Sequence, residues 1–153
     1  MLPAERKNMM KIIKKNNTSL KIQTHAKHFI FQKAGYILSK KEYNAELERK
    51  KTKYRRKLYK SSYAYEIEYT GKESAGCYLI FESDKEKPSY IGKTTDINLR
   101  FRNHLCANHF ENATKNGRRL EIFFCPASKE FSAGQIEALM IGYLWHKDLW
   151  NRF

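Results

Sequence analysis

One carboxylate lies in the most apolar stretch of the chain. This residue is Glu137, within the segment Gln135–Gly142. Removing an ionised carboxylate from water without a partner costs several kcal/mol or more. We therefore expect a metal ion, a cation or an open cleft beside Glu137.

Two further pairs of side chains have spacings that suit a reactive centre. Arg100 and His104 are four residues apart in a segment predicted to be helical, which places them on one face of that helix. Tyr78 and Tyr90 lie in two short apolar runs predicted to be neighbouring strands. Each pair has an ordinary alternative, because the tyrosines could be core residues and Arg100 and His104 a solvated helix face. Glu137 could then be held by Arg100 in a structural ion pair.

The elements that carry these residues are predicted in the order β-β-α-β-α. We expect buried or paired strands over residues 76–81, 89–92 and 120–125. Thr95 or Asp96 can cap the first helix, which ends before residue 112. Its apolar stripe comprises Ile97, Phe101 and Leu105. A second helix is expected over residues 131–147, with a buried side comprising Ile136, Leu139, Met140, Tyr143 and Leu144.

Two tripeptides on the neighbouring strands resemble the paired signature of the GIY-YIG nuclease superfamily. They are Gly76-Cys77-Tyr78, in which Cys77 replaces the family's Ile, and Tyr90-Ile91-Gly92, which matches literally. The family also carries an Arg and a His on the first helix, a carboxylate on the second and an Asn after it. The residues at those places are Arg100, His104, Glu137 and Asn151. The resemblance covers residues 74–153 and implies an α+β fold with a small three-stranded antiparallel sheet flanked by helices.

The resemblance also implies a chemistry, which is phosphodiester hydrolysis with one divalent ion. Mg²⁺ or Mn²⁺ would be held by Glu137, with waters completing its shell. Tyr78 would deprotonate or orient the attacking water, which requires nearby positive charge because the pKa of free Tyr is about 10. The full set of implied catalytic residues is Tyr78, Tyr90, Lys93, Arg100, His104, Glu137 and Asn151.

The basic residues are concentrated in the first half of the chain. The whole chain has 30 Lys and Arg against 16 Asp and Glu, a formal net charge of +14, and residues 1–75 hold 19 and 7 of these. Such an excess is typical of a nucleic-acid partner. We expect two domains, a basic and largely helical DNA-binding extension over residues 1–75 and a nuclease domain over residues 76–153.

One helix of this extension is predicted from Ser39 to Lys60. Its apolar stripe comprises Tyr43, Leu47, Tyr54 and Leu58. The rest of its surface is basic and suits phosphate contacts, although a solvated face is the ordinary alternative. The predicted nucleic-acid-binding residues are Arg49, Lys50, Lys51, Lys53, Arg55, Arg56, Lys57, Lys60, Lys93 and Arg102.

Together these features predict a Mg²⁺-dependent endonuclease that acts on double-stranded DNA. Because the extension precedes the nuclease domain, the layout is similar to that of small restriction or phage endonucleases. Cutting both strands requires a homodimer or two sequential nicks. The alternative is a noncatalytic nucleic-acid-binding protein on a nuclease fold, and an RNA target stays open.

Nothing in the sequence indicates export or a membrane. No apolar run has the length of a signal peptide or a membrane span. Cys77, Cys106 and Cys125 are odd in number and widely spaced, so they indicate neither a disulfide framework nor a common zinc signature. We expect a reducing, cytoplasmic compartment.

Overall fold

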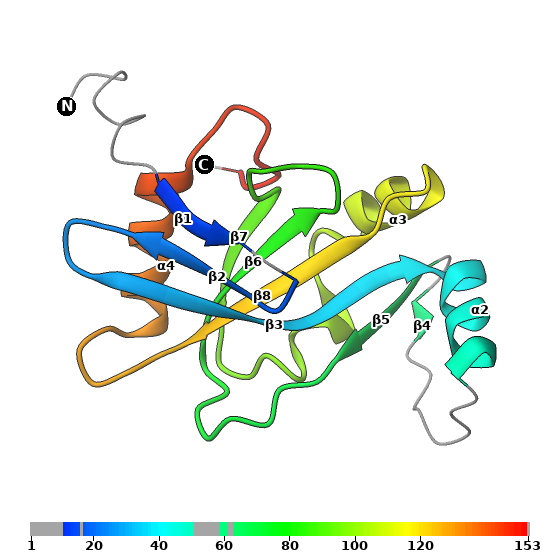
Figure 1. The fold of residues 1–153 in the computed structure, drawn as a ribbon, viewed down its shortest axis with the longest axis horizontal. Helices are drawn as coiled ribbons and strands as arrows, with labels where there is room; N and C mark the ends of the chain where they lie inside the picture. The colour runs from blue at the N-terminus through cyan, green and yellow to red at the C-terminus, as the bar shows by residue number, and fades with distance from the viewer. Residues whose placement is uncertain (1–10, 16, 51–58, 61–62, 153) are drawn as a thin grey trace.

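The computed structural model describes residues 11–15, 17–50, 59–60 and 63–152 (Figure 1). Its strands are β1 (Lys11–Lys15), β2 (Ser19–Gln23), β3 (His28–Ser39), β4 (Tyr59–Lys60), β5 (Tyr63–Ile67), β6 (Gly76–Glu82), β7 (Tyr90–Thr94) and β8 (Leu120–Pro126). Its helices are α2 (Lys40–Lys50), the 3₁₀ helix η1 (Arg100–Asn103), α3 (Ala107–Lys115) and α4 (Ala133–Leu144).

The described strands form one antiparallel sheet in the order β1-β2-β3-β8-β6-β7, with β5 paired to β3 and β4 paired to β5. Strands β6, β7 and β8 make the three-stranded antiparallel unit that the sequence predicts, and the α+β fold is confirmed. This unit continues into β3, which pairs with β8. The predicted boundary between residues 75 and 76 therefore lies inside a continuous sheet.

The prediction of a largely helical N-terminal extension is wrong. Strands β1, β2, β3 and β5 make up most of its described part. In β2 and the first half of β3 the buried side chains alternate with partly or fully exposed ones, and the buried ones there are Leu20, Ile22, Phe29 and Phe31. A period of two is the pattern of a half-buried strand, and here it decides the local structure despite the basic composition.

Helix α2 accounts for the first half of the helix predicted over residues 39–60. Its Tyr43 is buried and its Leu47 is partly buried, as expected for the apolar stripe. Residues 59–60 form β4, so the helical prediction is wrong there. Residues 51–58 lie outside the described part of the chain.

The helix predicted to carry Arg100 and His104 is broken into η1 and α3. Asp96 Oδ1 accepts the N–H of Asn98, and His104 has an extended backbone (φ −86°, ψ 136°) that ends η1. Side chains that bind nearby backbone groups in this way compete with helix formation. Leu105 is 73% exposed, so its predicted place in the apolar stripe is wrong.

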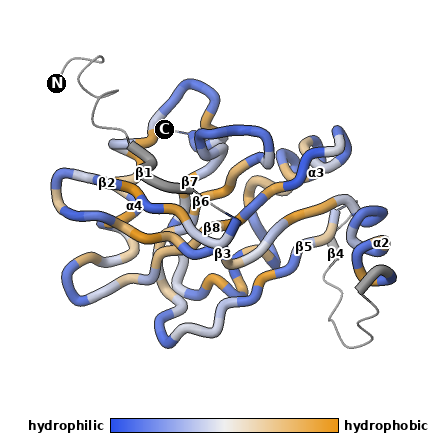
Figure 2. Tube along the Cα trace, in the orientation of Figure 1, coloured by the Kyte–Doolittle hydropathy of each residue, from blue (hydrophilic) through white to orange (hydrophobic). Residues whose placement is uncertain are grey.

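Two apolar layers cover the two faces of the sheet. One layer lies beneath η1 and α3 and contains Tyr78, Phe101 and Phe110. The other lies beneath α4 and contains Ile136 and Met140 of that helix. Leu20 and Ile22 of β2 and Phe29 and Phe31 of β3 belong to this second layer, so these N-terminal strands share a core with α4. Figure 2 shows the apolar residues running along these strands.

Helix α4 is shorter than the predicted range 131–147 but keeps most of its predicted buried side. It begins with a capping box, in which Ser132 and Gln135 each accept the other's backbone N–H. Leu139 is only partly buried, whereas the other predicted residues are buried. Among the described ranges, no helix is both long and apolar enough to cross a membrane.

Candidate active site

The Tyr78 side chain extends from β6, the middle strand of the three-stranded unit, over the neighbouring strand β7. Tyr78 pairs with Gly92 in the β6–β7 register. A Cβ added at Gly92 would lie 2.5 Å from both Cζ and Oη of Tyr78. The missing side chain at residue 92 therefore leaves the space through which the phenol reaches toward the outer edge of the sheet.

A fixed histidine holds the Tyr78 hydroxyl. His104 Nε2 lies 2.6 Å from Tyr78 Oη, and both side chains are buried. His104 Nδ1 accepts the backbone N–H of Cys106 at 3.0 Å, so the proton of the neutral ring is on Nε2 and is donated to Tyr78. Burial lowers the pKa of His104 to about 3, and the charge of Arg100 acts in the same direction. His104 is therefore a neutral donor that orients the tyrosine oxygen.

The lowered pKa predicts a loss of stability in acid. Between pH 6.5 and about 3 the unfolded chain binds a proton at His104 and the folded chain does not, so the free energy of unfolding falls as the pH falls through this window. The free energy of unfolding lost in this way reaches about 4 kcal/mol near pH 3. Urea unfolding of wild type and His104→Asn from pH 7 to pH 4 tests this expectation. An equally steep loss in the variant contradicts it.

Tyr90 and Arg100 complete the same cluster. The Tyr90 ring centroid lies 5.1 Å from that of His104 and 6.0 Å from that of Tyr78. Burial raises the pKa of Tyr78, and the positive charge of the Arg100 guanidinium opposes this shift. The structure thus brings together four of the predicted site residues, although a 3₁₀ turn and an extended residue hold Arg100 and His104 instead of one helical face.

Glu137 approaches this cluster from α4, the helix that packs on β6 and β7. Its side chain is partly buried, which raises the pKa of its carboxyl group, and the charge of Lys93 opposes that shift. The Glu137 charge also contributes to the raised pKa of Tyr90. Within the described residues Glu137 makes no ion pair with Arg100. The partly exposed carboxylate thus lies within electrostatic range of the exposed cation Lys93 and of Tyr90.

Asn151 braces the edge of β7. Its side-chain Oδ1 accepts the N–H of Ile91 at 3.0 Å and its Nδ2 donates to the carbonyl of Ile91 at 2.7 Å. The N–H of Trp150 donates to the Ser89 carbonyl at 2.7 Å. The C-terminal segment therefore covers the outer edge of β7 at the residues between Tyr90 and Gly92, which fixes the strand that carries both.

The donor set fits a hard divalent cation that keeps most of its waters. In the part of the chain that the structure describes, no three His, Cys, Asp or Glu side chains gather as a metal site. A single half-buried carboxylate suits Mg²⁺, which dehydrates reluctantly and is bound through one or two carboxylates. Glu137 is the residue that could hold it.

Most of the predicted nucleic-acid-binding cations lie outside the described side chains. Two of them, Lys93 and Arg102, are described and exposed. The backbones of Arg49, Lys50 and Lys60 are described within α2 and β4. Those not described at all are Lys51, Lys53, Arg55, Arg56 and Lys57.

Two features of the cluster were missed by reasoning from the sequence. One is the space that Gly92 leaves for the Tyr78 ring, and its signal was the glycine inside a strand, which indicates close approach of another group. The other is the Cys106 N–H that fixes the His104 tautomer. That contact depends on the break after η1, and no sequence pattern indicates it.

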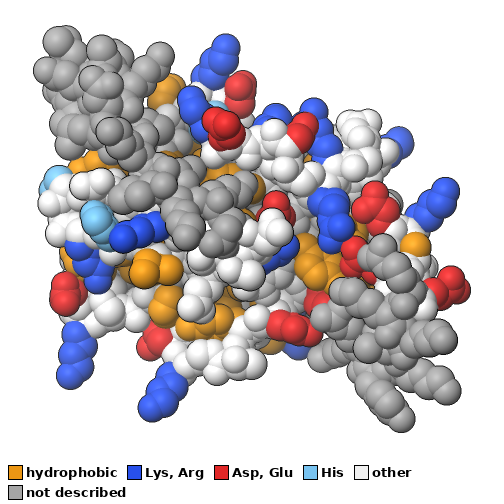
Figure 3. Space-filling model, viewed as in Figure 1, with side chains coloured by type: hydrophobic (Ala, Val, Ile, Leu, Met, Phe, Trp, Pro, Cys, Tyr) orange, Lys and Arg blue, Asp and Glu red, His pale blue; other side chains and the backbone are white. Residues whose placement is uncertain are grey.

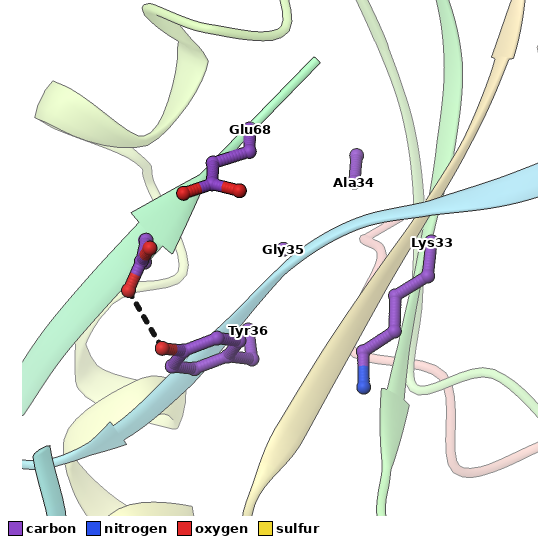
Figure 4. A pocket seen from close by; sticks show the side chains of 6 residues that line it. Lys33, Ala34, Gly35, Tyr36 and Glu68 are labelled. Carbon is purple, nitrogen blue, oxygen red and sulfur yellow. Dashed lines mark hydrogen bonds between the residues drawn. The ribbon is translucent and has the colours of Figure 1, made fainter. Parts of the chain in front are cut away.

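A separate hollow lies between β3 and β5. It is lined by Lys33, Ala34, Gly35, Tyr36, Glu66 and Glu68 (Figure 4). The Tyr36 hydroxyl donates to Glu66 Oε2 at 2.6 Å across it. None of the predicted site residues lines this hollow, so we do not assign the chemistry to it.

The comparison with protein families agrees with the placement of the cluster. Residues 74–144 match the family model of the GIY-YIG catalytic domain. This range contains every predicted catalytic residue except Asn151, which lies beyond its end. No curated protein and no solved structure matches the chain.

Proposed function

Because residues 74–144 are a GIY-YIG catalytic domain, we propose that this protein is a Mg²⁺-dependent endonuclease that hydrolyses double-stranded DNA. The observation that carries the proposal is the cluster at the edge of β7, where Tyr78 and Tyr90 meet Arg100 and Glu137 lies on the adjoining helix. Such a cluster combines an oriented hydroxyl, a cation for a phosphate and a carboxylate for a metal.

Tyr78 is the group that acts on the attacking water. The N–H of His104 occupies one lone pair of its oxygen, so the oxygen has a fixed direction. Burial raises the pKa of Tyr78, so the phenol stays protonated and its oxygen acts by orienting the attacking water. Arg100 adds positive charge beside that oxygen. The role of His104 is to position Tyr78.

The remaining residues hold the phosphate and the metal. Mg²⁺, when bound, supplies the positive charge that stabilises the leaving 3′ oxygen, and Mn²⁺ suits the same carboxylate. Glu137 would hold the ion. Arg100 presents a planar guanidinium suited to two phosphate oxygens, and the exposed Lys93 offers a second cation beside Glu137.

The proposal extends to the type of nuclease. A basic region in front of the catalytic domain supports a restriction-type or phage-encoded enzyme that selects its DNA sequence. With one cluster in each chain, cleavage of both strands requires a homodimer or two successive nicks. A noncatalytic binding protein is the outcome if the cluster binds DNA and never cuts it.

Replacing Tyr78 by Phe tests the proposal. Because this variant removes the oxygen that orients water, we expect plasmid nicking with Mg²⁺ to fall about 10²- to 10⁴-fold. DNA affinity should change little. Tyr63→Phe is the matched control, since Tyr63 is another buried tyrosine of the same apolar layer, packed edge-on to Phe110 at 5.7 Å. Equal activity of the two variants contradicts the assigned role of Tyr78.

A further inference from the structure

The turn between β2 and β3 is docked on α4, the helix that carries Glu137. We call residues 24–28 the basic turn. The N–H of His25 donates to the Tyr143 hydroxyl at 2.8 Å, and His25 Nδ1 bonds to the same hydroxyl. The two rings also stack, with centroids 5.5 Å apart. The turn itself is closed by Thr24, whose Oγ1 donates to the Lys27 carbonyl at 2.8 Å.

A second contact fixes the other side of the basic turn near the start of α4. Lys27 Nζ lies 5.2 Å from the centre of the Phe29 ring and 5.3 Å from that of Phe131. These two rings pack edge-on at 5.2 Å. Phe131 directly precedes Ser132, the N-cap of α4. The basic turn is therefore held at both sides and presents Lys27 from a rigid support.

The sequence segment that contains the basic turn is basic. Residues 11–39 contain six lysines, two histidines and no Asp or Glu. His25, Lys27 and His28 are exposed. Figure 3 shows Lys and His side chains, with an acidic side chain near them, at the end of the molecule where Figure 1 places the turn between β2 and β3. In the described part of the chain no carboxylate pairs with Lys27.

The start of α4 also lies beside Lys93, the exposed cation of the candidate active site. A Cβ added at Gly134, in the first turn of α4, would lie 3.8 Å from Lys93 Nζ. Glu137 follows Gly134 by three residues, close to one helical turn. Lys27 and Lys93 thus flank the start of the helix, although one comes from the N-terminal strands and the other from β7.

We propose that the basic turn, together with Lys93, binds the sugar–phosphate backbone of DNA next to the phosphate that is cleaved. Duplex DNA carries one negative charge per about 1.7 Å of its axis, so cations on one rigid surface can meet successive phosphates. The contact is independent of sequence and sets the register of the strand on the cluster. This inference rests on the proposed function for the identity of the bound polymer. The binding residues added, Lys27 and His28, lie outside the matched range 74–144.

The salt dependence of binding tests this proposal without requiring cleavage. Binding of a fluorescent DNA duplex is measured by anisotropy in EDTA at increasing salt. Loss of one phosphate contact in Lys27→Gln should reduce the slope of log K against log salt by about 0.9 and weaken binding several-fold. Lys27→Arg should keep the wild-type slope. Lys115→Gln, which removes an exposed lysine at the end of α3, is the matched control and should also keep it.

The possible outcomes separate this proposal from the proposed function. If Lys27→Gln folds with an unchanged melting temperature and keeps the wild-type slope, the basic turn is not a phosphate contact. If its slope falls but wild type never cuts DNA with Mg²⁺, the surface stands and the nuclease function fails. A slope change seen only with an RNA duplex overturns the choice of DNA.

Discussion

Replacing Glu137 by Gln is expected to abolish metal-dependent DNA cleavage. Glu137 is the carboxylate that α4 places beside the tyrosine cluster, and in the described chain no group of three potential metal ligands could take over its task. Glutamine keeps the size of the side chain and removes its charge. Without the ion, several kcal/mol of transition-state stabilisation are lost, which corresponds to about a thousandfold or more in rate.

Two readouts distinguish loss of the metal from loss of the fold. Titration with Mn²⁺, followed by electron paramagnetic resonance, should show binding to wild type and weak or no binding to Glu137→Gln. The melting temperatures of the two proteins should be similar or slightly higher for the variant, because burial raises the pKa of the Glu137 carboxyl group and the neutral amide avoids that cost. Glu130→Gln, an exposed carboxylate before α4, is the matched control. Undiminished cleavage by Glu137→Gln would contradict the assignment of Glu137 as the metal ligand.

Adding one methyl group at residue 92 is expected to displace the Tyr78 ring and so to reduce the activity of the candidate active site. The Cβ of Gly92→Ala would lie 2.5 Å from atoms of the Tyr78 ring, well inside van der Waals contact. The ring is buried and bound to His104, so it has little room to move. We expect a loss of about 1–3 kcal/mol in stability from overpacking. Displacing the Tyr78 oxygen by about 1 Å should also reduce the cleavage rate about 100-fold.

A second glycine offers the matched control for this variant. A Cβ added at Gly142, on the exposed side of α4, meets no atom within 4 Å. Gly142→Ala should therefore keep full activity and gain up to about 1 kcal/mol in stability, since alanine favours the helix. Thermal unfolding and plasmid cleavage of both variants check the pair. Full activity of Gly92→Ala would show that the Tyr78 ring does not need its present position.

The nuclease region could be predicted from its sequence because its signals are local. The run Gly76–Phe81 is apolar and continuous, and β6 occupies the same residues with one added at its end. Proline at residue 126 ends β8, as expected of a residue without an N–H. Tyr78, Tyr90, Arg100 and His104 lie in one cluster.

The N-terminal strands were not predicted because the many basic residues of this segment obscure the alternation of its apolar and polar residues. Leu20 and Ile22 on β2 are paired with Phe31 and Phe29 on β3, which is the alternating pattern of a half-buried hairpin. The pairing of β3 with β8 could not be predicted at all, since it joins residues about 90 positions apart. Local propensity carries no information on such a partner.

The break after η1 shows why the relative positions of Arg100 and His104 could not be predicted from their spacing in the sequence. A separation of four residues places Arg100 and His104 on one face only if the helix is continuous. Here His104 leaves the helix, and its ring accepts the N–H of Cys106, two residues further along the chain. The break is what makes His104 a neutral donor to Tyr78.

The most direct test of the catalytic role of this cluster is the incubation of wild-type protein with supercoiled plasmid in Mg²⁺ and in EDTA. We predict nicked or linear DNA only with the metal, with 5′-phosphate and 3′-hydroxyl ends that DNA ligase can rejoin. The opposite result is a folded protein that binds DNA and leaves both DNA and RNA intact with Mg²⁺ or Mn²⁺. That result would contradict hydrolysis at the edge of β7 and leave a nucleic-acid-binding protein on a nuclease fold.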